Sequence, residues 1–189
     1  MTSRRRFILT LTAALLFISA SILATRPFVQ QRADAVWQTV SFPFRLAALA
    51  AQEPDAVLLQ PVDGIRVSQI ADTWGAPRSG GRSHQGQDIF AERGTPVFAV
   101  SPGFVTSLHG SSRGGIVVWV TGAGGRRYYY AHLEEHAAGL SVGDKVEVDT
   151  VLGYVGTSGN AAGTPPHLHF GVYTAQGAID PLPLFAERD

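Results

Sequence analysis

The apolar residues of this 189-residue chain follow three successive patterns. Residues 7–24 form a nearly continuous apolar run, which predicts a hydrophobic N-terminal helix. Residues 25–55 are rich in alanine, and apolar side chains recur at roughly helical spacing between Val29 and Val40. We therefore expect a short helical linker there, with a helix that ends at Pro43 because proline interrupts helices.

Short strands dominate the pattern beyond Leu58. Runs of β-branched and aromatic residues are bounded by Gly, Ser or Pro, as is typical of strands. The runs are 96–100, 103–108, 115–120, 127–130, 145–148, 151–155 and 167–172. The glycine-rich stretch 122–125 predicts a hairpin loop between two of them. No long helical pattern intervenes, so residues 56–189 are predicted to form an all-β domain, an antiparallel β-sandwich or small barrel.

The N-terminal residues 1–24 have the features of an export signal. Three arginines at positions 4–6 precede the apolar run, and Ser19-Ala20-Ser21 offers a small-residue cleavage site. The same run is also long enough to anchor the chain in the inner membrane. Signal peptide and membrane anchor both stay open, and either one predicts an exported protein of the periplasm or cell envelope.

Charge and cysteine content narrow the function further. The formal net charge is zero, but residues 1–50 hold six arginines and a single acidic residue, so nine basic and fourteen acidic residues remain in the rest of the chain. A mildly acidic body argues against nucleic acid as a partner. The chain has no cysteine, which excludes disulfides and thiolate metal sites. Any transition-metal site must therefore use histidine and carboxylate. The sequence carries no signal for the oligomeric state.

Two histidines stand one residue apart in the last predicted strand. Because a strand sends residues i and i+2 to the same face, His167 and His169 are expected on one side and Leu168 and Phe170 in the core. The prolines at positions 165–166 mark the point where the strand leaves a loop. Two imidazoles on one face suit a small reacting centre that includes a metal ion.

Two further motifs carry histidine. In a regular strand His84 and Asp88 would lie about 13 Å apart, too far to share an ion. Gly86 permits a bend, so we expect a loop that turns there and enters a strand at Asp88, which lets both side chains converge. His132 ends the tyrosine-rich run 128–130 and is expected to project from the end of that strand into a groove.

Together these motifs resemble the lysostaphin or LytM type of zinc metallopeptidase. That family has His-x-x-x-Asp, a later His-Leu after a Tyr-rich strand, and a closing His-x-His-Phe. The resemblance extends to residues 94–97, 142–146 and 156–159 and covers roughly residues 58–182. It implies the duplicated-hybrid-motif β fold. It also implies one zinc ion per chain, bound by His84, Asp88 and His169, with His132 and His167 as catalytic residues beside a metal-activated water.

The implied ligands agree with the chemistry of catalytic zinc. Two imidazoles and one carboxylate leave one coordination position open, as in catalytic rather than structural sites. The resemblance thus implies a zinc-dependent endopeptidase that cuts peptidoglycan stem peptides or cross-bridges. Arg78 and Arg82 either pair with carboxylates of that peptide or remain solvated. The alternative function is a catalytically silent envelope adaptor that activates other cell-wall hydrolases.

A second zinc motif overlaps the first. Residues 132–136 spell His-x-x-Glu-His, a pattern that binds zinc from a helix. Here it follows directly on the tyrosine-rich strand, and it leaves His84, Asp88, His167 and His169 unexplained. We interpret this pattern as a coincidence.

Overall fold

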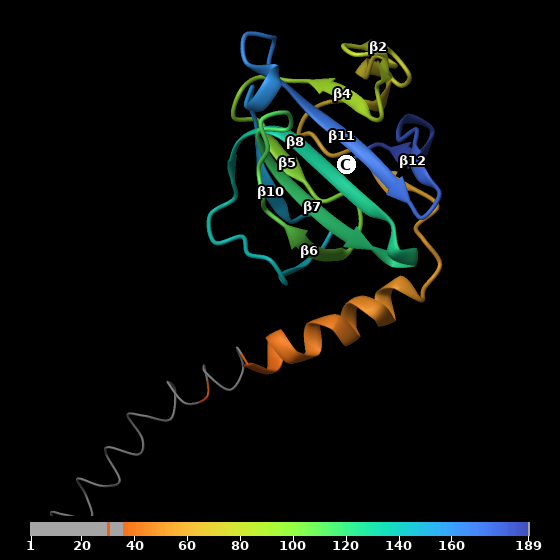
Figure 1. Ribbon diagram of the computed structural model, residues 1–189, viewed down its shortest axis with the longest axis vertical. Coiled ribbons are helices and arrows are strands. Elements are labelled where there is room, and N and C mark those ends of the chain that lie inside the picture. Colours follow the sequence, from red (N-terminus) through yellow and green to blue (C-terminus); the bar gives the residue numbers. More distant parts are fainter. Residues whose placement is uncertain (1–29, 31–35, 189) are drawn as a thin grey trace, which may run out of the picture. The chain divides into compact units, whose positions relative to one another are not determined.

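The computed structural model describes residue 30 and residues 36–188 (Figure 1). Contacts divide the chain into two compact units, Met1–Phe42 and Pro43–Asp189. The residues expected to form the export signal or anchor, 1–24, lie outside the described part. Residues 36–50 are helical and continue through Pro43, where we expected an end. The residues after Pro43 are mostly strong helix formers, which offsets the loss of one backbone donor.

No helix among the described residues is both long enough and apolar enough to cross a membrane. The rest of the described chain is built from strands, joined by turns and four short 3-10 helices. These helices are η1 (Val67–Gln69), η2 (Ala123–Gly125), η3 (Gly159–Ala161) and η4 (Leu182–Leu184). The strands are β1 (Leu58–Leu59), β2 (Pro77–Arg78), β3 (Arg82–Ser83), β4 (Gln87–Phe90), β5 (Pro96–Phe98), β6 (Gly103–Ser107), β7 (Ile116–Gly122), β8 (Arg127–His136), β9 (Lys145–Val146), β10 (Val151–Val155), β11 (His167–Thr174), β12 (Gly177–Ile179) and β13 (Phe185–Ala186). The predicted all-β fold is confirmed.

Two long strands, β8 and β11, organise the main sheet. They run antiparallel side by side, and β7 extends the sheet beyond β8 (Figure 1). The outer edge of β11 pairs with β4 along its first half and with β12 along its last residues. The end of β8 pairs with β10, which in turn pairs with β5. Four strands in the order β4, β11, β8 and β7 therefore form one continuous platform.

Alternating side chains give this platform two different faces. Tyr128 and Tyr130 of β8 and Leu168 and Phe170 of β11 are fully buried in the apolar core. The intervening residues, such as Tyr129, line a cleft on the opposite face. This is the period-two alternation that the sequence predicts. Residues 122–125 form the expected hairpin turn between β7 and β8.

The alternation changes phase at His132. Its φ angle is 62°, in the left-handed region that non-glycine residues rarely occupy. The β7–β8 register shifts at the same place, because one residue of β7 faces two of β8 between the Ile116–Leu133 and Val118–Tyr130 pairs. Such a bulge redirects side chains. It turns His132 to the cleft and returns Leu133 to the core.

Candidate metal centre

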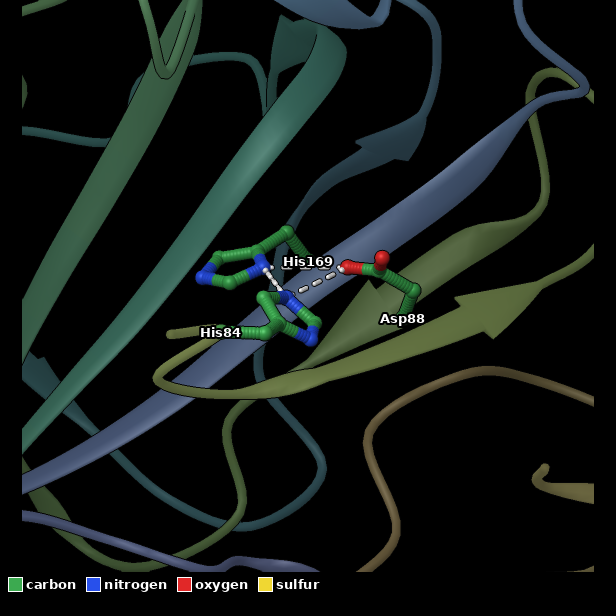
Figure 2. A group of neighbouring side chains, drawn as sticks. All are labelled: His84, Asp88 and His169. Atoms are coloured by element: carbon green, nitrogen blue, oxygen red, sulfur yellow. Dashed lines mark hydrogen bonds and ion pairs between the residues drawn. The ribbon is translucent and has the colours of Figure 1, made fainter. Parts of the chain in front are cut away.

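Main-chain pairing brings two of the predicted ligands together. In the antiparallel register of β4 and β11, Asp88 lies directly opposite His169. His84 lies in the bend between β3 and β4, and its side chain points back toward the other two (Figure 2). A Cβ at Gly86 would lie 2.5 Å from the backbone oxygen of Phe170 and 2.7 Å from Cε1 of His169. Only glycine allows the bend to pass this close.

The three side chains present their donor atoms to one point. Nε2 of His84 lies 2.8 Å from Nδ1 of His169, and Oδ1 of Asp88 lies 3.1 Å and 3.0 Å from these two nitrogens. One ligand atom from each residue falls within 4.8 Å of the others. His84 and Asp88 are buried and His169 is half-buried. Two imidazole nitrogens and a carboxylate oxygen converging this closely fit a divalent cation such as zinc.

Thr73 holds two of the three side chains, those of His84 and Asp88, in place. Its carbonyl oxygen lies 2.7 Å from Nδ1 of His84, so Nδ1–H donates and Nε2 keeps its lone pair toward the centre. The hydroxyl of Thr73 accepts the backbone N–H of Asp88 at 2.9 Å. A hydrogen bond behind a ligating histidine sets its tautomer and orientation, which metal sites commonly require.

Arg78 binds the second carboxylate oxygen of Asp88. Its Nη2 donates to Oδ2 of Asp88 at 2.5 Å, which leaves Oδ1 facing the two histidines. The sequence predicts that Arg78 either pairs with a carboxylate of the substrate peptide or remains solvated, and this contact is neither of the two. The guanidinium pairs with the protein's own carboxylate.

Both predicted catalytic histidines border the ligands. Nδ1 of His132 donates to the carbonyl of Ser158 at 2.9 Å, and Nδ1 of His167 donates to that of Pro165 at 2.8 Å. Each ring therefore keeps the lone pair on Nε2 for a reacting proton. The ring centres of His132 and His167 are 5.1 Å apart, and those of His132 and His169 are 5.9 Å apart. The structure thus brings all five predicted site residues together.

Burial and mutual contact shift the pKa values of the site. Burial alone would raise the pKa of Asp88, but the contacts of its carboxylate with the His169 and His84 rings outweigh burial and hold that pKa far below its ordinary value. Burial lowers the pKa of His132 to about 4, against a smaller opposing effect of the Ser158 hydrogen bond. Burial also lowers the pKa of His169. At neutral pH the centre therefore contains a carboxylate with uncharged His132 and His169.

The centre opens into a cleft of about 620 Å³ across the platform. The β2–β3 hairpin and the loops before β7 and β11 line it, together with aromatic side chains. His136 does not line it, and its Nε2 bonds the carbonyl of Val117 at 2.9 Å. Residues 132–136 are strand rather than helix. The interpretation of the His-x-x-Glu-His pattern as a coincidence is therefore confirmed.

The sequence profile of peptidase family M23 matches residues 82–181, which include the three converging side chains and both neighbouring histidines. The chain belongs to this family. It is 38% identical over 122 residues to the L-Ala–D-Glu endopeptidase of Bacillus subtilis, an alignment that covers 59% of this chain and 37% of that one. It is 34% identical over 109 residues to the glycyl-glycine endopeptidase ALE-1 of Staphylococcus capitis, covering 54% of this chain and 29% of that one.

Solved structures agree on the fold of this M23 domain. A zinc-containing peptidase from Vibrio cholerae superposes with a TM-score of 0.58 at 25% identity, covering 68% of this chain and 40% of that one. The resemblance to a metallopeptidase family is confirmed. The chain spans only about a third of the length of the two relatives named above.

Several supporting contacts of this M23 centre have no signal in the sequence. Thr73 lies eleven residues before His84 and outside every motif of the sequence, and Ser158 contributes a backbone carbonyl that any residue possesses. The expectation that His132 ends its strand is wrong, because β8 continues to His136 through the bulge. Only the chain fold reveals these contacts.

Proposed function

We propose that this chain is a zinc-dependent endopeptidase that hydrolyses peptide bonds in the stem peptides or cross-bridges of peptidoglycan. The convergence of His84, Asp88 and His169 beside two further histidines, in a member of family M23, carries this proposal. Residues 56–189 would form the peptidase domain. The predicted export signal would bring this domain to the wall.

The protein supplies a complete set of groups for this reaction. His84, Asp88 and His169 would hold one zinc ion, which when bound polarises a substrate carbonyl and lowers the pKa of a coordinated water to about 7. Thr73 orients His84, and Arg78 holds the second oxygen of Asp88. These contacts keep the ligands in one arrangement before the substrate arrives.

His132 and His167 would move the protons of the reaction. Both side chains line the cleft, and Nδ1 of each ring is committed to a backbone carbonyl, so Nε2 is the nitrogen left for the reaction. One such nitrogen can accept the proton of the attacking water and return it to the leaving amine. The low pKa of His132 keeps this side chain in its proton-accepting form at neutral pH. The other imidazole can steady the charge that develops on the carbonyl oxygen.

The cleft suits an extended peptide. It runs across four strands and has aromatic and apolar side chains such as Phe90, Trp119 and Tyr129 among its lining residues. An adaptor without catalysis needs no complete ligand set, and this chain retains all three ligands and both neighbouring histidines. The proposal therefore favours hydrolysis over the adaptor function.

Digestion of purified sacculi tests the proposal. Zinc-loaded protein is expected to release muropeptides with new free amino groups, identified by mass spectrometry. Asp88→Asn, which removes the charge of the ligand carboxylate, should release none at the same protein concentration. If zinc-loaded protein with the native fold produces no new amino or carboxyl ends, the proposal of a wall hydrolase is wrong.

A further inference from the structure

The cleft carries a positive charge that the rest of the β-rich body does not. Beyond residue 50 the chain has nine basic and fourteen acidic residues. The cleft, in contrast, is lined by Arg78, Arg82 and Arg113, and Asp88 is the single acidic residue among its lining residues. A cleft with this excess of positive charge attracts anionic ligands.

The three arginines differ in what they already bind. Arg78 pairs with Asp88, and Arg82 donates to the backbone oxygen and the hydroxyl of Ser79 at 3.2 Å and 3.4 Å. Within the described part of the chain, the side chain of Arg113 makes no hydrogen bond or ion pair, and it is exposed. Arg113 is therefore the cation that remains available to a ligand.

The backbone around Arg113 is nevertheless firmly held. Its carbonyl accepts the N–H of Asn160 at 3.0 Å, and the next carbonyl, of Gly114, accepts the N–H of His132 at 2.8 Å. Ser111 and Gly115 exchange two backbone hydrogen bonds across the loop, at 3.1 Å and 2.8 Å. Arg113 thus stands on a braced loop, one residue from the carbonyl that supports His132. A group in such a position can act with defined geometry.

Arg113 lies at the opposite end of the platform from the β2–β3 hairpin. The β2–β3 hairpin precedes β4 at one end of the β4, β11, β8 and β7 order, and the loop of Arg113 precedes β7 at the other. The charge of Arg113 reaches the cleft floor: burial and Tyr173 raise the pKa of Tyr129, and Arg113 opposes that rise. A peptide that crosses the metal ligands and passes His132 therefore meets Arg113 next.

We infer that Arg113 binds a carboxylate of the substrate peptide on the His132 side of the cleaved bond, so that the cleft selects anionic peptides over neutral ones. This inference rests on the proposed function. A guanidinium matches a carboxylate with two parallel N–H···O hydrogen bonds, which an amide cannot reproduce. Arg113 is a specificity-determining residue that leaves the metal ligands and proton transfer untouched.

Two stem tetrapeptides that differ in one group test the inference. One contains γ-linked D-glutamate with its free carboxylate, and the other contains D-isoglutamine, where a carboxamide replaces that carboxylate. Steady-state cleavage of both is compared for the zinc-loaded chain, Arg113→Gln, Arg113→Lys and Arg66→Gln. Arg66 is an exposed arginine outside the cleft, so its variant controls for the loss of one positive charge.

The unaltered chain and Arg66→Gln should show a KM about tenfold lower for the acid than for the amide. Arg113→Gln should abolish this preference by raising KM for the acid, with kcat changed less than twofold, and Arg113→Lys should retain part of it. No acid preference in the unaltered chain, or an equal loss for both peptides in Arg113→Gln, would overturn the inference.

Calorimetric binding separates this inference from the proposed function. The same peptides are titrated into each zinc-loaded variant. If neither peptide is cleaved, tighter binding of the acid that disappears in Arg113→Gln still supports a carboxylate subsite, while the proposed hydrolysis falls. Equal affinities for acid and amide in the unaltered chain count against the subsite, whether or not cleavage occurs.

Discussion

Asp88 and His169 lie opposite each other on β4 and β11, with Oδ1 of the carboxylate 3.0 Å from Nδ1 of the imidazole. The distance between facing residues of an antiparallel pair is set by the main-chain ladder. Two of the three proposed ligands are therefore positioned by the fold itself. The third, His84, depends on the bend at Gly86 and on the carbonyl of Thr73.

Gly86→Ala is expected to destabilise the domain and weaken zinc binding. The new Cβ would lie 2.5 Å from the backbone oxygen of Phe170, so the bend or β11 must shift. Overpacking of this kind costs about 1–3 kcal/mol in the free energy of unfolding. Chemical denaturation and zinc titration measure the two effects. Gln85→Ala is the control, because Gln85 is exposed beside the bend. Unchanged stability and zinc affinity in Gly86→Ala would contradict the close approach.

Arg78→Gln is expected to weaken zinc binding about 10- to 100-fold, as is usual when a residue that orients a ligand is lost. The variant frees Oδ2 of Asp88, which Arg78 otherwise holds at 2.5 Å. Competition with a chromogenic chelator measures the affinity. Arg82→Gln removes the same charge from the same hairpin without touching Asp88 and should bind zinc normally. Equal affinities in the two variants would show that Arg78 has no positioning role.

His132→Asn should retain zinc and lose about 100- to 10,000-fold in hydrolysis, the usual contribution of a general acid or base. Asparagine tolerates the left-handed backbone found at His132, where φ is 62°, so the variant is expected to fold. Metal analysis and peptide cleavage give the two readouts.

The matched control is His136→Gln, four residues further along β8. His136 bonds the carbonyl of Val117 and does not line the cleft, so zinc content and cleavage should both be preserved. Loss of zinc in His136→Gln would revive the His-x-x-Glu-His interpretation. Undiminished cleavage in His132→Asn would refute the role given to His132.

The metal-free domain should lose stability as the pH falls from about 6.5 to about 4. The pKa of His132 lies near 4 in the fold against 6.5 for an ordinary histidine, mainly through burial, so the unfolded chain binds more protons within this window. Burial lowers the pKa of His169 in the same direction. Denaturation of metal-free protein across this range should show a smaller loss in His132→Asn. Identical pH dependence in the two proteins would contradict the assignment.

Strand faces could be predicted from sequence because side-chain alternation is local information. The buried pair Tyr128 and Tyr130 and the pair Leu168 and Phe170 identify the core side of β8 and β11, and so the side on which His169 lies. The bulge at His132 was not predictable in this way. Its left-handed φ occurs at a histidine, without the glycine that normally signals such a backbone.

The partners of the arginines also escaped sequence reasoning. Arg78 and Arg82 lie in one glycine-rich stretch and look equivalent there, yet the first pairs with Asp88 and the second with Ser79. Arg113 belongs to no motif of the sequence, and only the packing of its loop against His132 places it beside the cleft. Such pairings depend on tertiary contacts between distant segments.

Anomalous diffraction at the zinc edge, from crystals of the zinc-loaded protein, shows directly whether His84, Asp88 and His169 bind the metal. We expect one peak per chain at about 2.0–2.2 Å from Nε2 of His84, Oδ1 of Asp88 and Nδ1 of His169. A peak at any other group of residues, or none among these three in fully zinc-loaded protein, would contradict it.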